Sequence, residues 1–248
     1  MHDTSVDHII VISGADPLPP HVVAALTAER APDDAATEVV AVDGGLDHAL
    51  AAGLRPTTVI GDLDSISPDA ATWTQRNDVR VVRHPTDKDA TDTELALADA
   101  AARSPRRITL VGGGDRLDHS LAAIGALGAP ALAGIAQLDG WWDGHHLQVL
   151  HGPVERTIDV PPGSTLSILA LHGPCRGVTV TGVRWPLDGA VLEPLVGLGV
   201  SNEAVADTVH LAVADGVLTV FDRITAEPDT HGATAPNPTI TPDESDER

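Results

Sequence analysis

The chain has 248 residues, and 42% of them are hydrophobic, which is enough material for one large domain or two modest ones. It carries 36 acidic against 15 basic side chains, so its formal net charge of -21 argues against nucleic acid and anionic membrane surfaces as partners. Its apolar runs are shorter than the roughly 20 residues of a transmembrane helix, and its opening MHDTSVDHII lacks a secretory-signal pattern, so we expect a cytoplasmic protein.

The first half of the chain alternates between β-branched runs and segments with helical spacing. The β-branched runs nearly all end in Gly, Asp or His, and they cover residues 8–15, 37–45, 57–62, 79–84 and 107–114. Ala- and Leu-rich segments between them, such as 46–54 and 93–104, have apolar spacing that suits helices. Apolar strands that alternate with helices are typical of a parallel sheet covered on both faces. Residues 1–140 are therefore predicted to form a doubly wound α/β domain with a mostly parallel sheet.

The second half of the chain has a different pattern. Period-two alternation, frequent Gly and Pro, and the lack of helical spacing predict a C-terminal antiparallel β-sandwich domain over residues 141–224. The boundary is expected near Gly140. Residues 225–248 are rich in Thr, Pro and acid and are predicted to form a disordered acidic tail. The single cysteine, Cys175, has no Cys partner in the chain and is expected to be a reduced structural residue.

Two carboxylates one residue apart, Asp62 and Asp64, follow the apolar run that ends at Gly61. Side chains two apart in an extended segment point to the same side, and two carboxylates that close repel each other unless a cation lies between them. Mg²⁺ suits such a pair because it commonly uses one or two carboxylates together with water and phosphate oxygens. The alternative is that Asp64 and Ser65 only form an Asx-type turn or cap the next segment. Both interpretations remain open from this motif alone.

A second motif lies in HPTDKDATDTELALADA, residues 84–100. Thr91 and Glu94 have the spacing of a capping box, which predicts a helix that starts there with Asp92 in its first turn. Capping does not account for Lys88 and Asp89, which precede the helix. Lys88 is the only lysine of this acidic chain. We therefore expect it to be a counter-charge for phosphate or for the neighbouring carboxylates, with a solvated surface lysine as the alternative.

Further strand ends carry glycine and acid. The run predicted over 107–114 ends in three glycines at 112–114, where the backbone can approach a ligand closely and a following helix would favour an anion. A tight turn without a ligand is the alternative. Arg116, Asp118 and His119 follow and supply a cation, a carboxylate and a titratable ring.

Asp43 and Gly44 end another predicted strand. Because parallel strands place their carboxyl ends at one edge of a sheet, the acidic and glycine-rich ends together predict one ligand site there.

Four stretches, in this order and spacing, closely resemble the thiamine pyrophosphokinase (thiamine diphosphokinase) family: residues 42–67, 84–98, 112–122 and 182–203. The resemblance implies an α/β catalytic domain, a β-sandwich domain and a homodimer. It also implies transfer of the pyrophosphoryl group of ATP, as co-substrate, to thiamine, with release of AMP. The expected mechanism is in-line attack of the thiamine hydroxyl oxygen on the β-phosphorus, with positioning and Mg²⁺ doing most of the catalysis.

The resemblance also implies roles for particular residues. It assigns an Mg²⁺ and ATP site to a set of carboxylates: Asp62, Asp64, Asp89 and Asp92. It assigns neutralisation of the polyphosphate to two cations: Lys88 and Arg116. It places a further set of residues at the same cleft: Asp43, Gly44, Asp118 and His119. Of these, Asp118 or His119 would accept the proton. It assigns thiamine binding across the dimer interface to residues of the second half: Trp185, Ser201 and Asn202.

Some alternatives remain beside this resemblance. Asp115 stands where the family usually has Gly, which adds negative charge near the expected phosphates. Trp185 is alternatively a core residue, since Trp is often buried. The acceptor is alternatively a hydroxymethyl pterin, and the protein is alternatively a sensor that binds nucleotide or thiamine without turnover. A full set of metal-binding carboxylates disfavours the sensor, and consumption of ATP would distinguish it.

Overall fold

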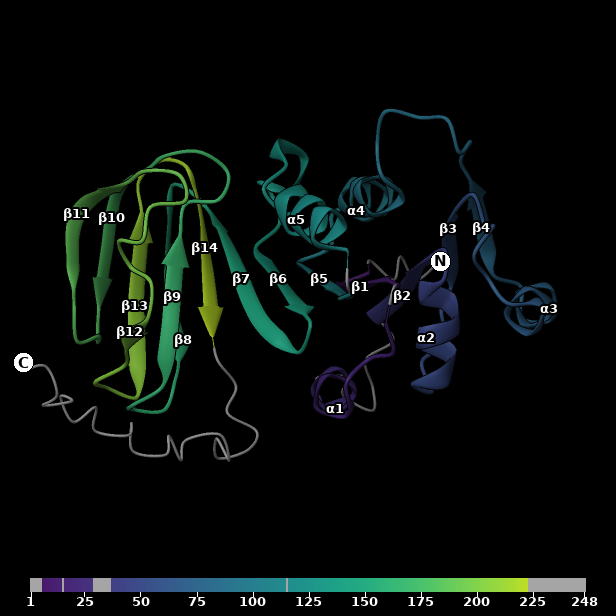
Figure 1. Ribbon diagram of the computed structural model, residues 1–248, viewed down its shortest axis with the longest axis horizontal. Coiled ribbons are helices and arrows are strands. Elements are labelled where there is room, and N and C mark those ends of the chain that lie inside the picture. Colours follow the sequence, from purple (N-terminus) through teal and green to yellow (C-terminus); the bar gives the residue numbers. More distant parts are fainter. Residues whose placement is uncertain (1–5, 15, 29–36, 115, 223–248) are drawn as a thin grey trace, which may run out of the picture.

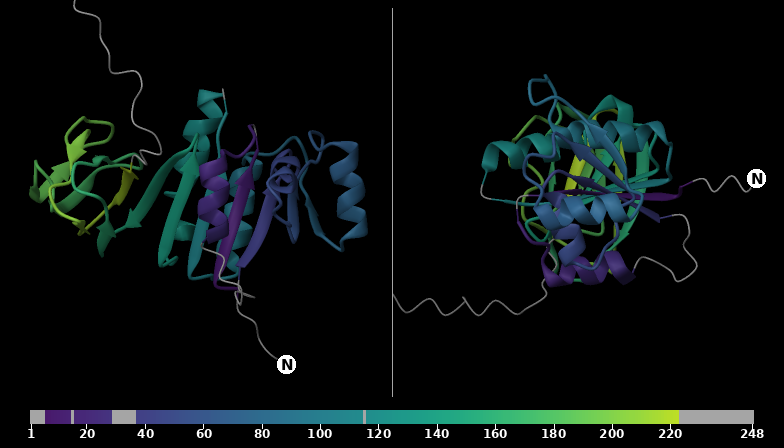
Figure 2. Two further views of the ribbon diagram at one scale, coloured as in Figure 1. Left: turned by 90° about the horizontal axis from the view of Figure 1, so that it is seen from below. Right: turned by 90° about the vertical axis from the view of Figure 1, so that its right-hand side faces the viewer.

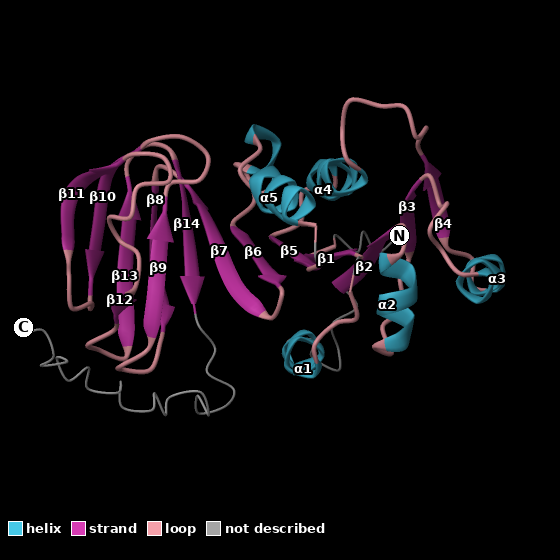
Figure 3. Ribbon diagram, viewed as in Figure 1, coloured by secondary structure: helices cyan, strands magenta, loops and turns pink. Residues whose placement is uncertain are grey.

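The computed structural model describes residues 6–14, 16–28, 37–114 and 116–222. These residues form a ten-stranded mixed sheet and a four-stranded antiparallel sheet (Figures 1 and 3). The parallel part of the large sheet has the spatial order β6 (Gln137–Trp142), β5 (Arg107–Gly112), β1 (His8–Ser13), β2 (Thr37–Val42), β3 (Thr58–Gly61) and β4 (Arg80–Arg83). Every predicted β-branched run of the first half is thus a strand, and the prediction of a mostly parallel sheet is confirmed.

Helices cover both faces of this parallel part, as the doubly wound pattern predicts (Figures 1 and 2). One face carries α4 (Asp92–Ala102), α5 (Leu117–Ala126) and the 3₁₀ turn η1 (Pro130–Leu132), and the other carries α1 (Pro20–Ala28), α2 (Gly45–Ala51) and α3 (Pro68–Arg76). Alternate residues of each strand therefore enter different cores. In β1, for example, Ile9 packs on the α4 side and Ile10 on the α1 side.

The large sheet continues into the second half of the chain without a break. There β6 pairs antiparallel with β7 (His145–His151), and the order runs on through β14 (Val217–Asp222), β9 (Thr165–Leu169) and β12 (Asn202–Glu203). The four-stranded sheet has the order β11 (Leu187–Leu192), β10 (Cys175–Thr181), β13 (Thr208–Val213) and β8 (Val154–Asp159). Inward-facing apolar residues of both sheets form one core, so the predicted antiparallel sandwich is confirmed.

Gly140 lies inside β6, where it is paired with Leu110 of β5 and Leu147 of β7. The domain boundary near Gly140 therefore stays a prediction, since the sheet is continuous through it. Cys175 is buried in the sandwich, and its thiol donates to the Val217 carbonyl at 3.1 Å, consistent with a structural residue. The predicted acidic tail and Asp115 lie outside the described residues. Among the residues that are described, none of the helices is both long enough and apolar enough to span a bilayer.

A buried polar network joins β1, β5 and β6. The Asp139 carboxylate is 2% exposed and forms a salt bridge with Arg107, whose Nε donates to Oδ2 at 2.8 Å. The Thr109 hydroxyl donates to the other oxygen of Asp139 at 2.5 Å, and the His8 ring lies 2.8 Å from the same hydroxyl. A buried carboxylate is tolerated only when its oxygens are paired in this way, so Asp139 depends on neighbours from adjacent strands.

We expect Asp139→Ala to lower the free energy of unfolding by about 3 to 5 kcal/mol, because it removes a buried carboxylate that pairs with the largely buried Arg107 and accepts the Thr109 hydroxyl. Urea unfolding followed by circular dichroism measures the change. The matched control is Asp159→Ala, which removes an exposed carboxylate from β8 and is expected to change the free energy by about 0.5 kcal/mol or less. A loss below about 1 kcal/mol for Asp139→Ala would show that the network contributes little.

Candidate active site

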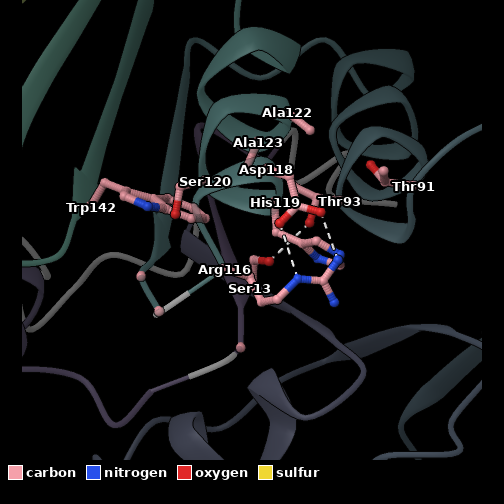
Figure 4. A pocket seen from close by; sticks show the side chains of 13 residues that line it. Ser13, Thr91, Thr93, Arg116, Asp118, His119, Ser120, Ala122, Ala123 and Trp142 are labelled. Atoms are coloured by element: carbon pink, nitrogen blue, oxygen red, sulfur yellow. Dashed lines mark hydrogen bonds and ion pairs between the residues drawn. The ribbon is translucent and has the colours of Figure 1, made fainter.

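A cavity of about 310 Å³ opens at the carboxyl ends of β1 and β5. These two strands flank the point where the chain reverses its direction of travel across the sheet, which is where open α/β sheets bind ligands. The end of β1 and the residues just after β1 and β5 contribute Ser13, Gly14, Gly113 and Gly114 to its wall. Side chains from the first turns of α4 and α5 complete the polar part of the wall (Figure 4): Thr91, Thr93, Arg116, Asp118 and His119.

The inner wall of this cavity combines hydroxyl groups with apolar surface. The hydroxyls of Ser13 and Thr93 lie 2.9 Å apart and connect the end of β1 to the first turn of α4 (Figure 4). Trp142, Ala122 and Ala123 line the same cavity, and the Trp142 side chain belongs to the core on the α4 side. The cavity therefore offers a flat apolar wall beside hydrogen-bonding groups, which is the usual composition of a small-molecule site.

The glycine turn that follows β5 packs against a carboxylate. Asp143, in the β6–β7 turn, accepts a hydrogen bond from the Gly114 N–H at 2.9 Å. A Cβ at Gly113 would lie 2.2 Å from Oδ1 of Asp143, so a larger residue there would displace this carboxylate. The glycine turn was expected to let the backbone approach a ligand, but the Gly114 amide is directed to a side chain of the protein instead.

Arg116 and Asp118 form a bidentate ion pair at the mouth of the cavity. Nη2 of Arg116 lies 2.6 Å from Oδ2 of Asp118, Nε donates to Oδ1 at 3.0 Å, and both side chains are more than half exposed. The hydrogen bond from Arg116 holds the pKa of Asp118 well below its usual range. His119, one residue further on α5, is exposed and lines the cavity.

The carboxylates predicted at the next strand ends lie side by side. Asp43 follows β2 in the left-handed region at φ 44°, and its Oδ1 accepts the N–H of Leu63 at 3.1 Å. Leu63 is also left-handed, at φ 64°. Gly61 has φ 145°, and a Cβ there would lie 1.7 Å from Oδ1 of Asp43. The close approach of these two loops therefore requires glycine at position 61.

The charges of these carboxylates affect one another. Burial, followed by the charges of Asp92, Asp62 and Asp64, raises the pKa of Asp43 to about 6. The nearby charge of Asp62 raises the pKa of Asp64, whereas the N–H of Asp64 and the hydroxyl of Thr86, both donating to Asp62, lower the pKa of Asp62. The Asx-type turn considered as an alternative thus exists, but Asp62 forms it. The pair remains a concentration of negative charge at the edge of the sheet.

Lys88 is paired with a carboxylate. Its Nζ lies 2.9 Å from Oδ2 of Asp92 and donates to the Pro85 carbonyl at 2.9 Å, with 15% of the side chain exposed. Thr91 and Glu94 form the predicted capping box at the start of α4. The other oxygen of Asp92 is buried, and among the described residues it has no hydrogen-bond partner. Asp92 therefore has one unsatisfied oxygen near the acid cluster, by which we mean Asp43, Asp62 and Asp64.

The predicted set of metal-binding carboxylates is not gathered into one group. Asp89 is exposed, and in the described ranges no three His, Cys, Asp or Glu side chains are placed to hold a metal ion together. The arrangement brings together Asp62 and Asp64, with Asp43 and Asp92 near enough to affect their charge. Two carboxylates with open positions still fit Mg²⁺, because Mg²⁺ usually completes its shell with water and phosphate oxygens.

The residues predicted from the second half lie in the β-sandwich region. Trp185 is 56% exposed, so the alternative that it fills the core is wrong. The Cζ atom of Arg184 lies over its ring, 5.1 Å from the ring centroid. Asn202 is buried, and its amide binds the backbone of Trp185 through Oδ1 at 3.1 Å and Nδ2 at 2.8 Å. Ser201 lines a cavity of about 260 Å³ together with His145, Phe221 and Asp222. Asn202 therefore orients the segment that carries Trp185.

Several polar residues of the site were not predicted. Ser13 ends a strand just as Asp43 does, and the strand-end criterion extended to hydroxyls would have found it. Thr93 and Thr86 lie within the acidic motif, where only the charged residues were considered. Asp143 begins an Asp-Gly turn, and nothing in its local sequence indicates that it contacts a glycine turn about 30 residues away.

Comparison with known proteins gives two family matches along the chain. A family model described as thiamin pyrophosphokinase, catalytic domain, matches residues 33–134, and one described as thiamin pyrophosphokinase, vitamin B1 binding domain, matches residues 154–218. Together they cover more than half of the chain. A thiamine pyrophosphokinase of Bacillus subtilis (strain 168) is 28% identical over 183 residues, which are 72% of this chain and 84% of that protein.

Solved structures share the fold over nearly the whole described chain. The thiamine pyrophosphokinase from Bacillus subtilis superposes with a TM-score of 0.72 at 24% identity, covering 87% of this chain and 98% of its own. The enzyme from Geobacillus thermodenitrificans gives 0.70 at 25% identity, with 89% and 99% covered. The thiamin pyrophosphokinase from Candida albicans gives 0.67 at 13% identity, with 89% and 91% covered.

The raised pKa of Asp43 predicts a pH dependence of stability in metal-free buffer. The folded protein binds this proton up to about pH 6, whereas the unfolded chain releases it near the ordinary aspartate pKa of 3.8. The free energy of unfolding of the wild type, relative to Asp43→Asn, should therefore fall as pH rises from about 4 to about 6 and change little above. Urea unfolding across this range with EDTA measures the difference. Asp188→Asn, at an exposed carboxylate, is the control, and parallel curves for the wild type and Asp43→Asn would contradict the prediction.

Proposed function

The chain belongs to the thiamin pyrophosphokinase family, and from that premise we propose that it transfers the pyrophosphoryl group of ATP to the hydroxyethyl oxygen of thiamine. The products are thiamine diphosphate and AMP, and the protein is a transferase. The observation that carries this proposal is that the matches to a catalytic domain and to a vitamin B1 binding domain follow each other along one chain. The catalytic part also carries a cavity at the sheet's switch point and, near it, the turn at 61–67 that carries Asp62 and Asp64, which we call the carboxylate turn.

The reaction is a substitution at phosphorus. The hydroxyl oxygen of thiamine attacks the β-phosphorus of ATP, the bond between that phosphorus and the oxygen bridging to the α-phosphate breaks, and AMP leaves with both bonding electrons. The protein's task is chiefly to place both substrates in line and to stabilise the charge on the phosphate oxygens.

We place ATP between the cavity and the carboxylate turn. The first turn of α4 connects the two, because Thr91 and Thr93 line the cavity while Asp92 faces the acid cluster. The amino-terminal ends of α4 and α5 both favour anions. Arg116 is well placed to exchange its exposed partner Asp118 for a phosphate, since exposed ion pairs contribute little stability.

The residues that would hold Mg²⁺ are Asp62 and Asp64, with the unsatisfied oxygen of Asp92 as a third candidate. Bound there, the ion would neutralise charge on the phosphate oxygens and orient them. Asp89 is left out of this set, because among the described residues it is not grouped with Asp62 and Asp64 to hold an ion. Lys88 forms a salt bridge with one oxygen of Asp92 and thereby orients the Asp92 side chain. We therefore assign Lys88 as the counter-charge of this carboxylate and not as a direct ligand of the phosphate.

His119 is a better proton acceptor than Asp118. An aspartate carboxylate is ordinarily a weaker base than an imidazole, and in the free protein the hydrogen bond from Arg116 lowers the pKa of Asp118 further. His119 lines the same cavity and can take the proton of the thiamine hydroxyl as the new bond forms.

We assign thiamine binding to the exposed face of Trp185 and to the neighbouring cavity lined by Ser201. A cationic thiazolium is attracted by an aromatic face and by the negative surroundings of this acidic chain. Large apolar side chains are exposed along the same segment, which suggests that a second copy covers them in a homodimer: Val191, Leu195, Val196, Leu198, Val200 and Val205. Because the co-substrate is ATP, we place the reaction in the cytoplasm.

The alternatives are less well supported. A hydroxymethyl pterin acceptor is disfavoured because the second-half match is to a vitamin B1 binding domain. A sensor without turnover is disfavoured because the carboxylates that would hold Mg²⁺ lie near the cavity that would hold ATP, and a reaction needs both groups next to each other.

Release of AMP from ATP and Mg²⁺, with and without thiamine, tests the proposal when thiamine diphosphate is also identified by mass. We expect thiamine-dependent AMP from the wild type and a loss of about 100-fold in kcat for Asp62→Asn, because a carboxylate that would hold the phosphate-orienting Mg²⁺ is removed. Asp87→Asn, at an exposed carboxylate in the loop before α4, is the matched control and should be close to wild type. Near-normal turnover of Asp62→Asn would overturn the assignment of Asp62, and no AMP from the wild type would overturn the proposed reaction.

Trp185→Ala should raise the Michaelis constant for thiamine by about tenfold and that for ATP by less than about twofold, because it removes an aromatic face that only thiamine contacts. Trp185→Phe keeps an aromatic face, so its Michaelis constant for thiamine should lie between those of the wild type and Trp185→Ala. Steady-state kinetics with each substrate varied separately provide the values. An unchanged constant for thiamine would leave Trp185 without a part in binding.

A further inference from the structure

Hydrogen bonds join the segment after β2 to the carboxylate turn after β3 along its whole length. Asp43 accepts the N–H of Leu63 at 3.1 Å, and the Gly44 N–H donates to the Ser65 hydroxyl at 3.2 Å. Further along, Asp47 accepts both the N–H of Ser67, at 3.0 Å, and the hydroxyl of Ser67. The turn that carries Asp62 and Asp64 is thus held by hydrogen bonds at Leu63 and Ser65 in its middle and at Ser67 at its end.

The contact made by Asp47 differs from the other two. Both oxygens of its half-buried carboxylate bind one residue, Ser67, whereas Asp43 belongs to the acid cluster and the Gly44–Ser65 contact is exposed. Asp47 lies in the first turn of α2, which packs on β1 and β2 through buried Leu46 and Ala49. Asp47 is therefore held by a fixed helix, and its carboxylate is available to anchor a neighbouring loop.

Ser67 is the point where the carboxylate turn becomes a helix. Its hydroxyl accepts the N–H of Ala70 at 3.1 Å and caps α3. The turn from Gly61 to Ser67 is short, and Leu63 within it has a left-handed backbone at φ 64°. A residue other than Gly, Asn or Asp seldom adopts that conformation without outside support. Asp43 supports Leu63 directly, and the Asp47–Ser67 contact holds the end of the same turn.

We propose that Asp47 is a positioning residue for the reaction: through Ser67 it fixes the turn that presents Asp62 and Asp64. The inference rests on the proposed function, because it assigns Asp47 a part in that reaction. It acts through geometry, since the carboxylate of Asp47 is engaged with Ser67 and contacts no atom of the acid pair among its described hydrogen bonds. An amide side chain can accept the Ser67 N–H and donate to the Ser67 hydroxyl, so Asn is expected to replace Asp at this position.

The test compares variants of the full-length chain. Asp47→Ala should lower kcat by about 10- to 100-fold, the usual effect of losing a group that orients a functional side chain, with the Michaelis constant for thiamine changed by less than about twofold. Asp47→Asn should restore kcat to within about threefold of wild type, because it keeps the contacts without the charge. Asp69→Ala removes an exposed carboxylate from the first turn of α3 and is the matched control, expected to equal wild type.

Amide hydrogen exchange provides a readout that does not depend on turnover. In Asp47→Ala without metal or nucleotide, peptides covering 61–67 should exchange faster than in wild type, while peptides covering β5 should not change. If Asp47→Ala fails to fold, Asp47→Glu, which keeps the charge and displaces the oxygens, takes its place with the same expected direction.

Unchanged exchange at 61–67 together with unchanged kcat would overturn the proposal. A kcat of Asp47→Asn no higher than that of Asp47→Ala would also overturn the proposal, because the effect would then come from the lost charge and not from the lost hydrogen bonds. If the wild type itself released no thiamine-dependent AMP, the proposed function would fall, and the exchange data would still decide whether Asp47 fixes the turn.

Discussion

Repulsion between carboxylates at one edge of the sheet is the constraint on which the rest of the site depends. Adjacent parallel strands β2 and β3 deliver Asp43 and Asp62 to the same edge, and Asp64 follows on the same short turn. Burial and mutual charge raise the pKa of Asp43 to about 6, so this arrangement costs free energy in the folded chain. Backbone amides, a left-handed turn and the missing side chain of Gly61 hold the groups in place despite that cost. Such strain is typical of functional sites.

The same repulsion explains why the acid cluster and the cavity belong together. Lys88 neutralises one oxygen of Asp92, and the other oxygen of Asp92 stays unsatisfied within the described chain. A divalent cation carrying phosphate would relieve the excess charge, and the first turn of α4 leads from the carboxylates to the cavity between β1 and β5. In a chain of net charge -21, a polyphosphate needs such local devices, because the general field of the protein repels it.

Much of the fold could be predicted because it depends on local patterns. The strands β1 to β5 of the parallel part are β-branched runs, and the start of α4 follows from the capping box of Thr91 and Glu94. The sixth parallel strand, β6, has the sequence QLDGWW without a β-branched residue, and it was not predicted. The continuity of the large sheet through β6 and β7 could not be predicted, since pairing between strands depends on contacts that periodicity does not specify. The site was predicted as a set of strand ends. Its inner contacts were not, because they join residues about 20 to 30 positions apart: Asp43 with Leu63, Asp47 with Ser67, and Gly114 with Asp143.

Crystals grown with Mn²⁺ in place of Mg²⁺ and with α,β-methylene ATP would test the central claim most directly, because that nucleotide cannot be cleaved between its α- and β-phosphorus atoms. Anomalous scattering from manganese locates the ion independently of the phosphates. We predict an anomalous peak within coordinating distance of Asp62 and Asp64, with the nucleotide in the cavity between β1 and β5. An ordered nucleotide whose metal ion lies away from both carboxylates would contradict the account.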